Sequence, residues 1–270
     1  MGRILKLLLL YLAYQLAVFG VLMGVYMLKN GVMEMPDTSS SGYMSVVMWA
    51  QFLSTLAVGL HVVLGKYVPL DAFRLNTSNK SSVLLVSAVL IVVMGLWTNY
   101  FSELAGLPDN MKDVLVQMMD SPLGIISIVV AAPLVEELLF RGAIQGHLMR
   151  KWEKPCLGIV VSSLIFGVVH ANPAQIPFAF VVGMALGWMY YLTGSLVPGM
   201  LMHFVNNGSS VLLYTLSADP DATMVSWLGE TESLALAVVG IVLTAICIFI
   251  IRKRLVREPV QWYEGKNLRT

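Results

Sequence analysis

The sequence predicts an all-α, polytopic membrane protein: a bundle of eight transmembrane helices that encloses a polar cavity. Of the 270 residues, 57% are hydrophobic and 12% are charged, about half the charged fraction of an ordinary soluble domain. Most of its apolar segments approach the ~20 residues that a helix needs to cross a bilayer. The eight segments are residues 4–28, 43–65, 82–101, 122–149, 156–170, 174–192, 196–216 and 234–251.

The distribution of Lys and Arg predicts the orientation of the bundle. Fourteen of the seventeen basic residues lie in segments that share one side if the N-terminus is cytoplasmic, whereas Lys29 and Lys112 lie in the opposite loops. Cytoplasmic loops carry such an excess of Lys and Arg. An even number of spans returns the basic run 252–254 to the side of the N-terminus. We therefore expect both termini in the cytoplasm and membrane lipid as a partner.

Net charge and cysteine content exclude two other classes of protein. The formal net charge of +1 and the scattered basic residues argue against a nucleic-acid partner. The two cysteines lie far apart in the chain, near or inside apolar segments, so neither a disulfide framework nor a cysteine metal site is indicated. The sequence leaves the oligomeric state open.

The first three segments, within residues 1–119, are expected to form a scaffold. The following loop, 102–121, is acidic and carries apolar residues at helical spacing. This spacing predicts a short amphipathic helix at the outer interface, placed to act as a lid. The residues that define it are Leu107, Met111, Val114, Leu115 and Met118.

The fourth segment carries three charged residues within six positions: Glu136, Glu137 and Arg141. A charged side chain near the bilayer centre costs roughly 2.5 to 3.5 kcal/mol on the most lenient scale, so such residues indicate a functional site. Glu137 and Arg141 are i,i+4 neighbours and can pair, whereas Glu136 projects about 100° away from Glu137. A buried ion pair that only fixes helix register would leave Glu136 without a partner.

The fifth segment ends in a histidine next to a helix-breaking sequence. Pro173 disfavours helix at Asn172, so the helix should end within a residue or two of His170. If the preceding turn lies near Glu153, then Glu136 lies seventeen residues before it and His170 seventeen residues after it. At a rise of ~1.5 Å per residue, antiparallel helices would hold these two side chains at similar depth.

Polar residues recur in the loop 193–199 and in the seventh segment. The loop is uncharged, and irregular backbone at membrane depth must be sheltered by protein, so we expect it to be sunk below the surface. His203 and Asn207 follow at i,i+4 spacing on one helix face. Asn206 and the neighbouring serines are better explained as interhelical hydrogen-bonding residues.

These observations give three motifs in a fixed order, each inside an apolar segment. The motifs are Glu136-Glu137-x-x-x-Arg141, Phe166-x-x-x-His170 and His203-x-x-x-Asn207. Together they resemble the CAAX prenyl protease and bacteriocin-processing family, intramembrane glutamic peptidases of the type II CAAX protease kind. The resemblance covers about residues 120–215. It divides the chain into a scaffold (1–119), a protease-like core (120–216) and a C-terminal helix with a basic tail (217–270).

The resemblance implies an endopeptidase of the bacterial cytoplasmic membrane with its catalytic cavity inside the bundle. Glu136 would activate a water that His170 shares, while His203 and Asn207 would polarise the scissile carbonyl and stabilise the oxyanion. The resemblance also implies that no metal or other cofactor is needed and that the substrate is a peptide or membrane protein. Residues expected to support the site are Glu137, Arg141 and Phe166.

Three other functions remain open from the residues alone. Glu136, His170 and His203 could form a His₂Glu zinc site, although the His-x-x-x-His helix pair of many zinc peptidases is missing. The same fold could serve as a non-catalytic scaffold or a bacteriocin self-immunity factor. A transporter is least favoured, because it would predict inverted repeats, whereas the polar content lies in one half of the chain.

Overall fold

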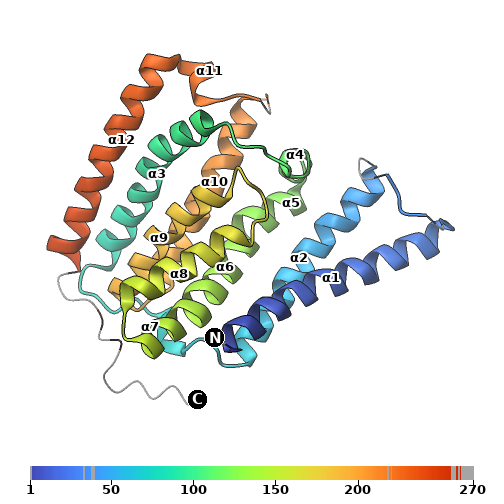
Figure 1. Cartoon of the computed structure of the whole chain (residues 1–270), viewed down its shortest axis with the longest axis horizontal. Helices are drawn as coiled ribbons and strands as arrows, with labels where there is room; N and C mark the ends of the chain where they lie inside the picture. Colours follow the sequence, from blue (N-terminus) through green and yellow to red (C-terminus); the bar gives the residue numbers. More distant parts are fainter. Residues whose placement is uncertain are drawn as a thin grey trace.

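The computed structural model describes residues 2–32, 34–37, 40–217, 219, 221–256, 260 and 262, and within these the chain is helical without any strand (Figure 1). The long helices are α1 (Gly2–Asn30), α2 (Ser41–Leu64), α3 (Lys80–Ala105), α8 (Pro155–Val168), α9 (Ile176–Thr193), α10 (Val197–Ser217) and α12 (Glu230–Ile250). The shorter elements are η1 (Leu70–Phe73), α4 (Lys112–Met119), α5 (Pro122–Ile126), η2 (Ser127–Ala131), α6 (Ala132–Glu136), η3 (Glu137–Gln145), α7 (Gly146–Trp152), α11 (Met224–Leu228) and η4 (Ile251–Leu255).

One central helix runs without interruption through α5, η2, α6, η3 and α7, over Pro122–Trp152. It begins with Pro122 at its first position, where a missing N–H costs nothing. Two of its segments, η2 and η3, are π-helical, and they flank the turn that carries Glu136. Short π-helical stretches are rare and occur frequently at functional sites, because they shift the register of the side chains that follow.

The other helices pack around this central helix. On one flank α3 lies against α12, and on the other α1 lies against α2, while α8, α9 and α10 fill the space between the flanks (Figure 1). Leu139, Phe140 and Ile144 of the central helix are almost fully buried in the core. The part of the central helix that carries Glu136, Glu137 and Arg141 is therefore enclosed by protein on several sides.

Six helices of the described chain are long and apolar enough to cross a membrane: α1, α2, α3, Pro122–Trp152, α9 and Glu230–Leu255. The predicted multi-pass, all-α architecture is confirmed, but the count of eight spans is not. The fifth predicted span is the 14-residue helix α8, shorter than the ~20 residues that a bilayer requires. The seventh is α10, a continuous helix of 21 residues. Its apolar sequence is interrupted by the polar side chains around His203.

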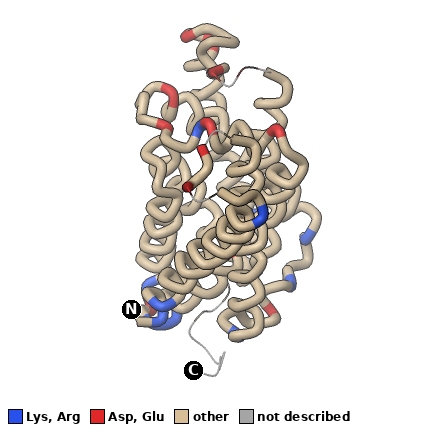
Figure 2. The backbone as a smooth tube through the Cα atoms, turned by 90° about the vertical axis from the view of Figure 1, so that its right-hand side faces the viewer, with Lys and Arg blue, Asp and Glu red and all other residues tan. Residues whose placement is uncertain are grey.

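The two ends of the bundle differ in charge. Most Lys and Arg residues gather at the end where α1 begins, and most Asp and Glu residues at the opposite end (Figure 2). The basic η4, which follows α12, also lies toward the end where α1 begins (Figure 1). The loop after α9 is sheltered by protein, since Ser195 and Leu196 are fully buried.

Candidate active site

The four residues predicted to be catalytic line one cavity. The cavity has a volume of about 450 Å³ and receives Glu136 from α6, His170 from the connection after α8, and His203 and Asn207 from α10. The three motifs, which are separated by as many as 71 positions along the chain, are thus brought together in space. The rest of the lining is mainly apolar, including Val182, Phe178 and Val211.

A chain of ionisable side chains begins at Arg141 and ends at Glu136. Arg141 lies 2.9 Å from Oε1 of Glu137, and both side chains are almost completely buried, so the predicted ion pair forms. The same Oε1 lies 3.2 Å from Nδ1 of His203. Nε2 of His203 lies 3.7 Å from Oε2 of Glu136, whose side chain is 17% exposed. His203 is therefore held between the two carboxylates.

Phe166 lies at the centre of the motif residues. Its ring packs edge-on against the rings of His170 and His203, with centroids 5.0 and 5.7 Å away. The guanidinium of Arg141 lies over the same ring, 4.3 Å from its centroid, where the ring quadrupole attracts a cation. Phe166 therefore contacts both candidate catalytic histidines and Arg141.

Helix α8 ends at Val168, and His170 lies two residues beyond this end, as predicted from Pro173. Its Nδ1 lies 2.7 Å from the carbonyl oxygen of Phe166. Since a carbonyl only accepts hydrogen bonds, Nδ1 carries the hydrogen and donates it. The other ring nitrogen, Nε2, can then keep its lone pair for a partner in the cavity.

Asn207 is fixed by its own hydrogen bonds. Its Nδ2 donates to the carbonyl of Ile128 at 2.9 Å, and its Oδ1 accepts from Nδ2 of Asn206 at 3.1 Å. Ile128 belongs to the π-helical segment η2. Because an amide nitrogen carries two hydrogens, one N–H of Asn207 remains to donate to a group in the cavity.

The predicted amphipathic helix forms as α4 and covers the cavity. Four apolar side chains of α4, and Met111 just before it, line the cavity opposite the polar residues. They are Met111, Val114, Leu115, Met118 and Met119. At its start, Lys112 pairs with Asp221, and this hydrogen bond raises the pKa of Lys112 above its usual value. At its end, Asp120 accepts a hydrogen bond from Tyr214 of α10 at 2.9 Å.

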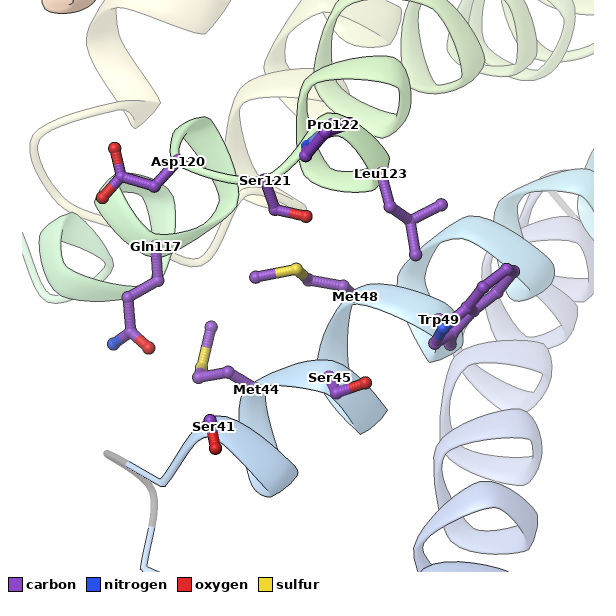
Figure 3. A pocket seen from close by; sticks show the side chains of 10 residues that line it. All are labelled: Ser41, Met44, Ser45, Met48, Trp49, Gln117, Asp120, Ser121, Pro122 and Leu123. Carbon is purple, nitrogen blue, oxygen red and sulfur yellow. The ribbon is translucent and has the colours of Figure 1, made fainter.

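A second cavity lies on the other side of α4. It has a volume of about 570 Å³ and separates the first turns of α2 from the corner between α4 and α5 (Figure 3). Met44 and Met48 point toward the side of Gln117, while Leu123 and Trp49 line the opposite edge of the cavity (Figure 3). It shares none of its lining residues with the first cavity, although both use α2 and α4 as walls.

Sequence reasoning missed two residues that shape the site, Gln145 and Gly199. Gln145, one turn beyond Arg141, is fully buried and donates to the carbonyl of Gly187 at 2.8 Å. Arg141 likewise donates to the carbonyl of Gly183 at 3.2 Å. A Cβ at Gly199 would lie 2.7 Å from Oε2 of Glu137. A polar Gln one turn after a buried charge was a usable signal, but a glycine opposite a carboxylate cannot be recognised before the helices are packed.

The zinc alternative requires three ligands that converge on one point in the described part of the chain. No group of three His, Cys, Asp or Glu side chains there is arranged so that it could hold a metal ion. The nitrogens of His203 are directed at the two carboxylates, and Nδ1 of His170 is bound to a backbone carbonyl.

Comparison with known proteins finds that the chain is similar to membrane peptidases. Residues 119–209 match the family described as "Type II CAAX prenyl endopeptidase Rce1-like", which confirms the resemblance seen in the three motifs. All of the candidate site residues fall inside this match.

Two curated proteins are similar to the chain. A Bacillus subtilis (strain 168) protein named "Putative membrane peptidase YdiL" is 25% identical over 217 residues, which cover 75% of this chain and 86% of that protein. The Staphylococcus aureus (strain USA300) protein named "Membrane-embedded CAAX protease MroQ" is 29% identical over 115 residues, or 41% of this chain and 47% of that protein. No solved structure matches.

Proposed function

We propose that this protein is an intramembrane endopeptidase that cleaves a peptide or membrane-associated protein with a water activated by Glu136. We place it in the bacterial cytoplasmic membrane, with both termini in the cytoplasm. The observation that carries the proposal is the convergence of Glu136, His170, His203 and Asn207 on one largely apolar cavity. The family match and the names of the two relatives support a protease.

Glu136 is the side chain best suited to act as the base. Of the two neighbouring glutamates, Glu137 is fully buried and held by Arg141 and His203, whereas Glu136 is partly exposed to the cavity. A water between Glu136 and Nε2 of His170 would lose its proton to the carboxylate as its oxygen attacks the scissile carbonyl carbon. The same proton would then pass to the leaving nitrogen as the C–N bond breaks.

His203 and Asn207 are placed to stabilise the charge that develops on the carbonyl oxygen. Asn207 has one N–H left after its bond to Ile128. His203 can donate from Nε2 when both of its ring nitrogens carry hydrogen. Donors held in place before the reaction are among the largest contributors to catalysis of acyl transfer.

We propose that this chemistry requires no metal ion. A carboxylate base, a water-sharing imidazole and two neutral or cationic donors supply each of the roles that peptide hydrolysis needs. The zinc alternative would require Nε2 of His170, Nε2 of His203 and Glu136 to turn toward one point. A zinc site also predicts that chelators abolish activity, whereas the metal-free mechanism predicts that they do not.

The test is cleavage of quenched fluorogenic apolar peptides by purified protein in liposomes. Glu136→Gln keeps the shape of the side chain but removes the proton acceptor, so turnover should fall by roughly 10²- to 10⁴-fold. Glu153→Gln, in the exposed turn between α7 and α8, is a matched control and should cleave like the parent. A chelator should leave the parent unchanged.

Each other outcome assigns a different function. Equal cleavage by the parent and by Glu136→Gln would remove Glu136 from the mechanism. Activity that chelators abolish and zinc restores would establish the metallopeptidase. If the parent cleaves no peptide while Glu136→Gln preserves the cellular phenotype, the protein is a scaffold or self-immunity factor instead.

A further inference from the structure

Asn172 is a fully buried amide in a connection that otherwise reaches the surface. Its Nδ2 donates to Oδ1 of Asp109 at 2.8 Å, and its Oδ1 accepts from the backbone N–H of Asn110 at 3.1 Å. Both side-chain atoms are thus used on one short segment, 62 and 63 positions away in the chain. Buried polar atoms are costly to leave without partners, so this pairing fixes the two segments against each other.

On its own side, Asn172 belongs to the connection that carries His170. The connection is tight, because Ala171 adopts a left-handed backbone conformation with φ of 52°, which is uncommon for a residue other than glycine. The carbonyl of Asn172 also accepts the backbone N–H groups of Gln175 and Ile176 at 2.9 and 3.0 Å, where α9 begins. A shift of Asn172 would therefore move His170.

On the opposite side, the bonded segment leads directly into α4. Oδ1 of Asp109 accepts the backbone N–H of Met111 at 3.0 Å, and Met111 is the first residue of this segment to line the cavity. The helix that follows covers the cavity with its apolar face. Asp109, and through it Asn172, therefore help to set the position of this cover at its N-terminal end, together with the Lys112–Asp221 pair and the hydrogen bond from the backbone N–H of Ala174 to the carbonyl of Pro108.

We propose that Asn172 is a positioning residue that holds the covering helix α4 and His170 in fixed relation across the cavity. The proposal rests on the proposed peptidase function, because it assigns the Asn172–Asp109 contact to the alignment of a cavity-lining imidazole with the cover over the substrate. Asn172 itself does not line the cavity, so it acts through its neighbours.

The hydrogen-bond pattern allows a test by exchange of donor and acceptor. Asn172→Asp removes the donor and faces the carboxylate of Asp109, so the contact should break. Asp109→Asn keeps an oxygen that can accept from both Asn172 and Met111, and its new N–H group points to solvent because Asp109 is exposed. In the double variant, the amide introduced at position 109 would turn its NH₂ group toward the carboxylate introduced at position 172 and donate to it, so the bond from the backbone N–H of Met111 would be lost. That carboxylate would accept the backbone N–H of Asn110, as the native amide oxygen does.

The first measurement is independent of peptide cleavage. A cysteine placed at Ser127, a buried residue that lines the cavity, is labelled with N-ethylmaleimide in a background with Cys156→Ser and Cys247→Ser. If the contact holds α4 closed, Asn172→Asp should label faster by about tenfold, the factor that loss of one hydrogen bond allows. Asp109→Asn should label at the rate of the protein that keeps both native residues. The double variant restores the contact with position 172 but not the bond to Met111, so its rate should lie between this rate and that of Asn172→Asp.

The second measurement is steady-state cleavage of the quenched fluorogenic apolar peptides. Asn172→Asp should lower kcat by at least about tenfold, because a displaced His170 no longer meets the water, and the double variant should recover most of this loss. A merely structural role would lower the amount of folded protein without changing kcat per folded molecule.

The two measurements separate the failure of each proposal. If labelling follows the predicted pattern but neither the parent nor any variant cleaves peptide, the contact between Asn172 and Asp109 stands and the peptidase function fails. If Asn172→Asp labels and cleaves like the parent, or if the double variant recovers neither property, Asn172 does not position α4 and His170.

Discussion

Nδ1 of His203 lies 3.2 Å from Oε1 of Glu137, and Nη1 of Arg141 lies 2.9 Å from the same oxygen. Glu137 therefore does more than neutralise an arginine four residues away. It fixes the orientation of an imidazole whose other nitrogen faces Glu136 at 3.7 Å. An acceptor on one ring nitrogen sets which nitrogen carries the hydrogen, and so what the other nitrogen can do.

The first prediction concerns Arg141, which is 1% exposed and pairs with a fully buried carboxylate. Arg141→Met keeps most of the volume but strands the charge of Glu137, so the free energy of unfolding should fall by about 3 to 5 kcal/mol. Adding Glu137→Gln removes the stranded charge and should recover part of the loss. Unfolding in detergent, followed by circular dichroism, measures both changes.

A different result would change the role of Arg141. If Arg141→Met is as stable as the parent but inactive, the guanidinium acts in the chemistry and not in support of the fold. If the double variant is less stable than Arg141→Met, the hydrogen bond between Glu137 and His203 outweighs the cost of the unpaired charge.

The second prediction concerns Gly199, because a Cβ there would lie 2.7 Å from Oε2 of Glu137. In Gly199→Ala the carboxylate must shift, and His203 should shift with it, so kcat should fall by roughly 10²-fold. Alanine favours helix over glycine by about 1 kcal/mol, so the intrinsic helical preference of α10 should not account for the loss. Steady-state kinetics of the purified variant measures kcat.

Gly208→Ala is the matched control on the same helix. Its Cβ would meet only Cγ1 of Val129, at an ordinary contact distance of 3.6 Å. This variant should keep the parent's kcat. If Gly199→Ala also keeps it, the carboxylate can move without displacing His203, and the proposed orienting role of Glu137 is wrong.

Much of the local structure around the site could be predicted from sequence. The i,i+4 spacing predicted the Glu137–Arg141 pair because helix geometry alone brings such residues together. Pro173 predicted where α8 ends, and apolar spacing predicted α4. The uncharged composition of 193–199 predicted a buried loop, and Ser195 and Leu196 are buried. The ion pair and the two helices depend on interactions within a few residues, whereas the buried loop is also held from a distance, since the backbone N–H of Leu196 donates to the carbonyl of Ala72.

The remaining features depend on how separate helices pack. The family resemblance implied that His203 acts on a substrate carbonyl, but its contact with Glu137 arises only from the packing of α10 on the central helix. The π-helical segments that flank Glu136 shift the register away from the 3.6-residue period on which sequence patterns rely. The link from Asn172 to Asp109 spans 63 positions and has no local signal.

The third prediction concerns topology. If both termini are cytoplasmic, Lys66→Cys in the connection after α2 and Lys112→Cys at the start of α4 should face opposite sides of the membrane. In cells, a membrane-impermeant thiol reagent should label Lys112→Cys, while Lys66→Cys should be labelled only after permeabilisation. Both variants are made with Cys156→Ser and Cys247→Ser. Labelling of both positions from the same side would contradict the proposed arrangement.

The last prediction asks whether Glu136 and His170 act on the same water. Both line the cavity, and Nδ1 of His170 donates to the carbonyl of Phe166. Nε2 of His170 is therefore available to the proposed water. Glu136→Gln and His170→Ala should each lower kcat by roughly 10²-fold or more. Residues that act as a unit are non-additive, so the double variant should be little worse than the poorer single variant.

This comparison uses kcat per folded molecule, with the folded fraction of each variant measured by gel filtration in detergent. Two losses that multiply would mean that His170 acts at a different step, such as holding the substrate, and would move it out of the base's immediate surroundings. His147, which lies near the basic end of the central helix outside the cavity lining, supplies the control. His147→Ala should leave kcat unchanged and should add nothing to the loss in Glu136→Gln.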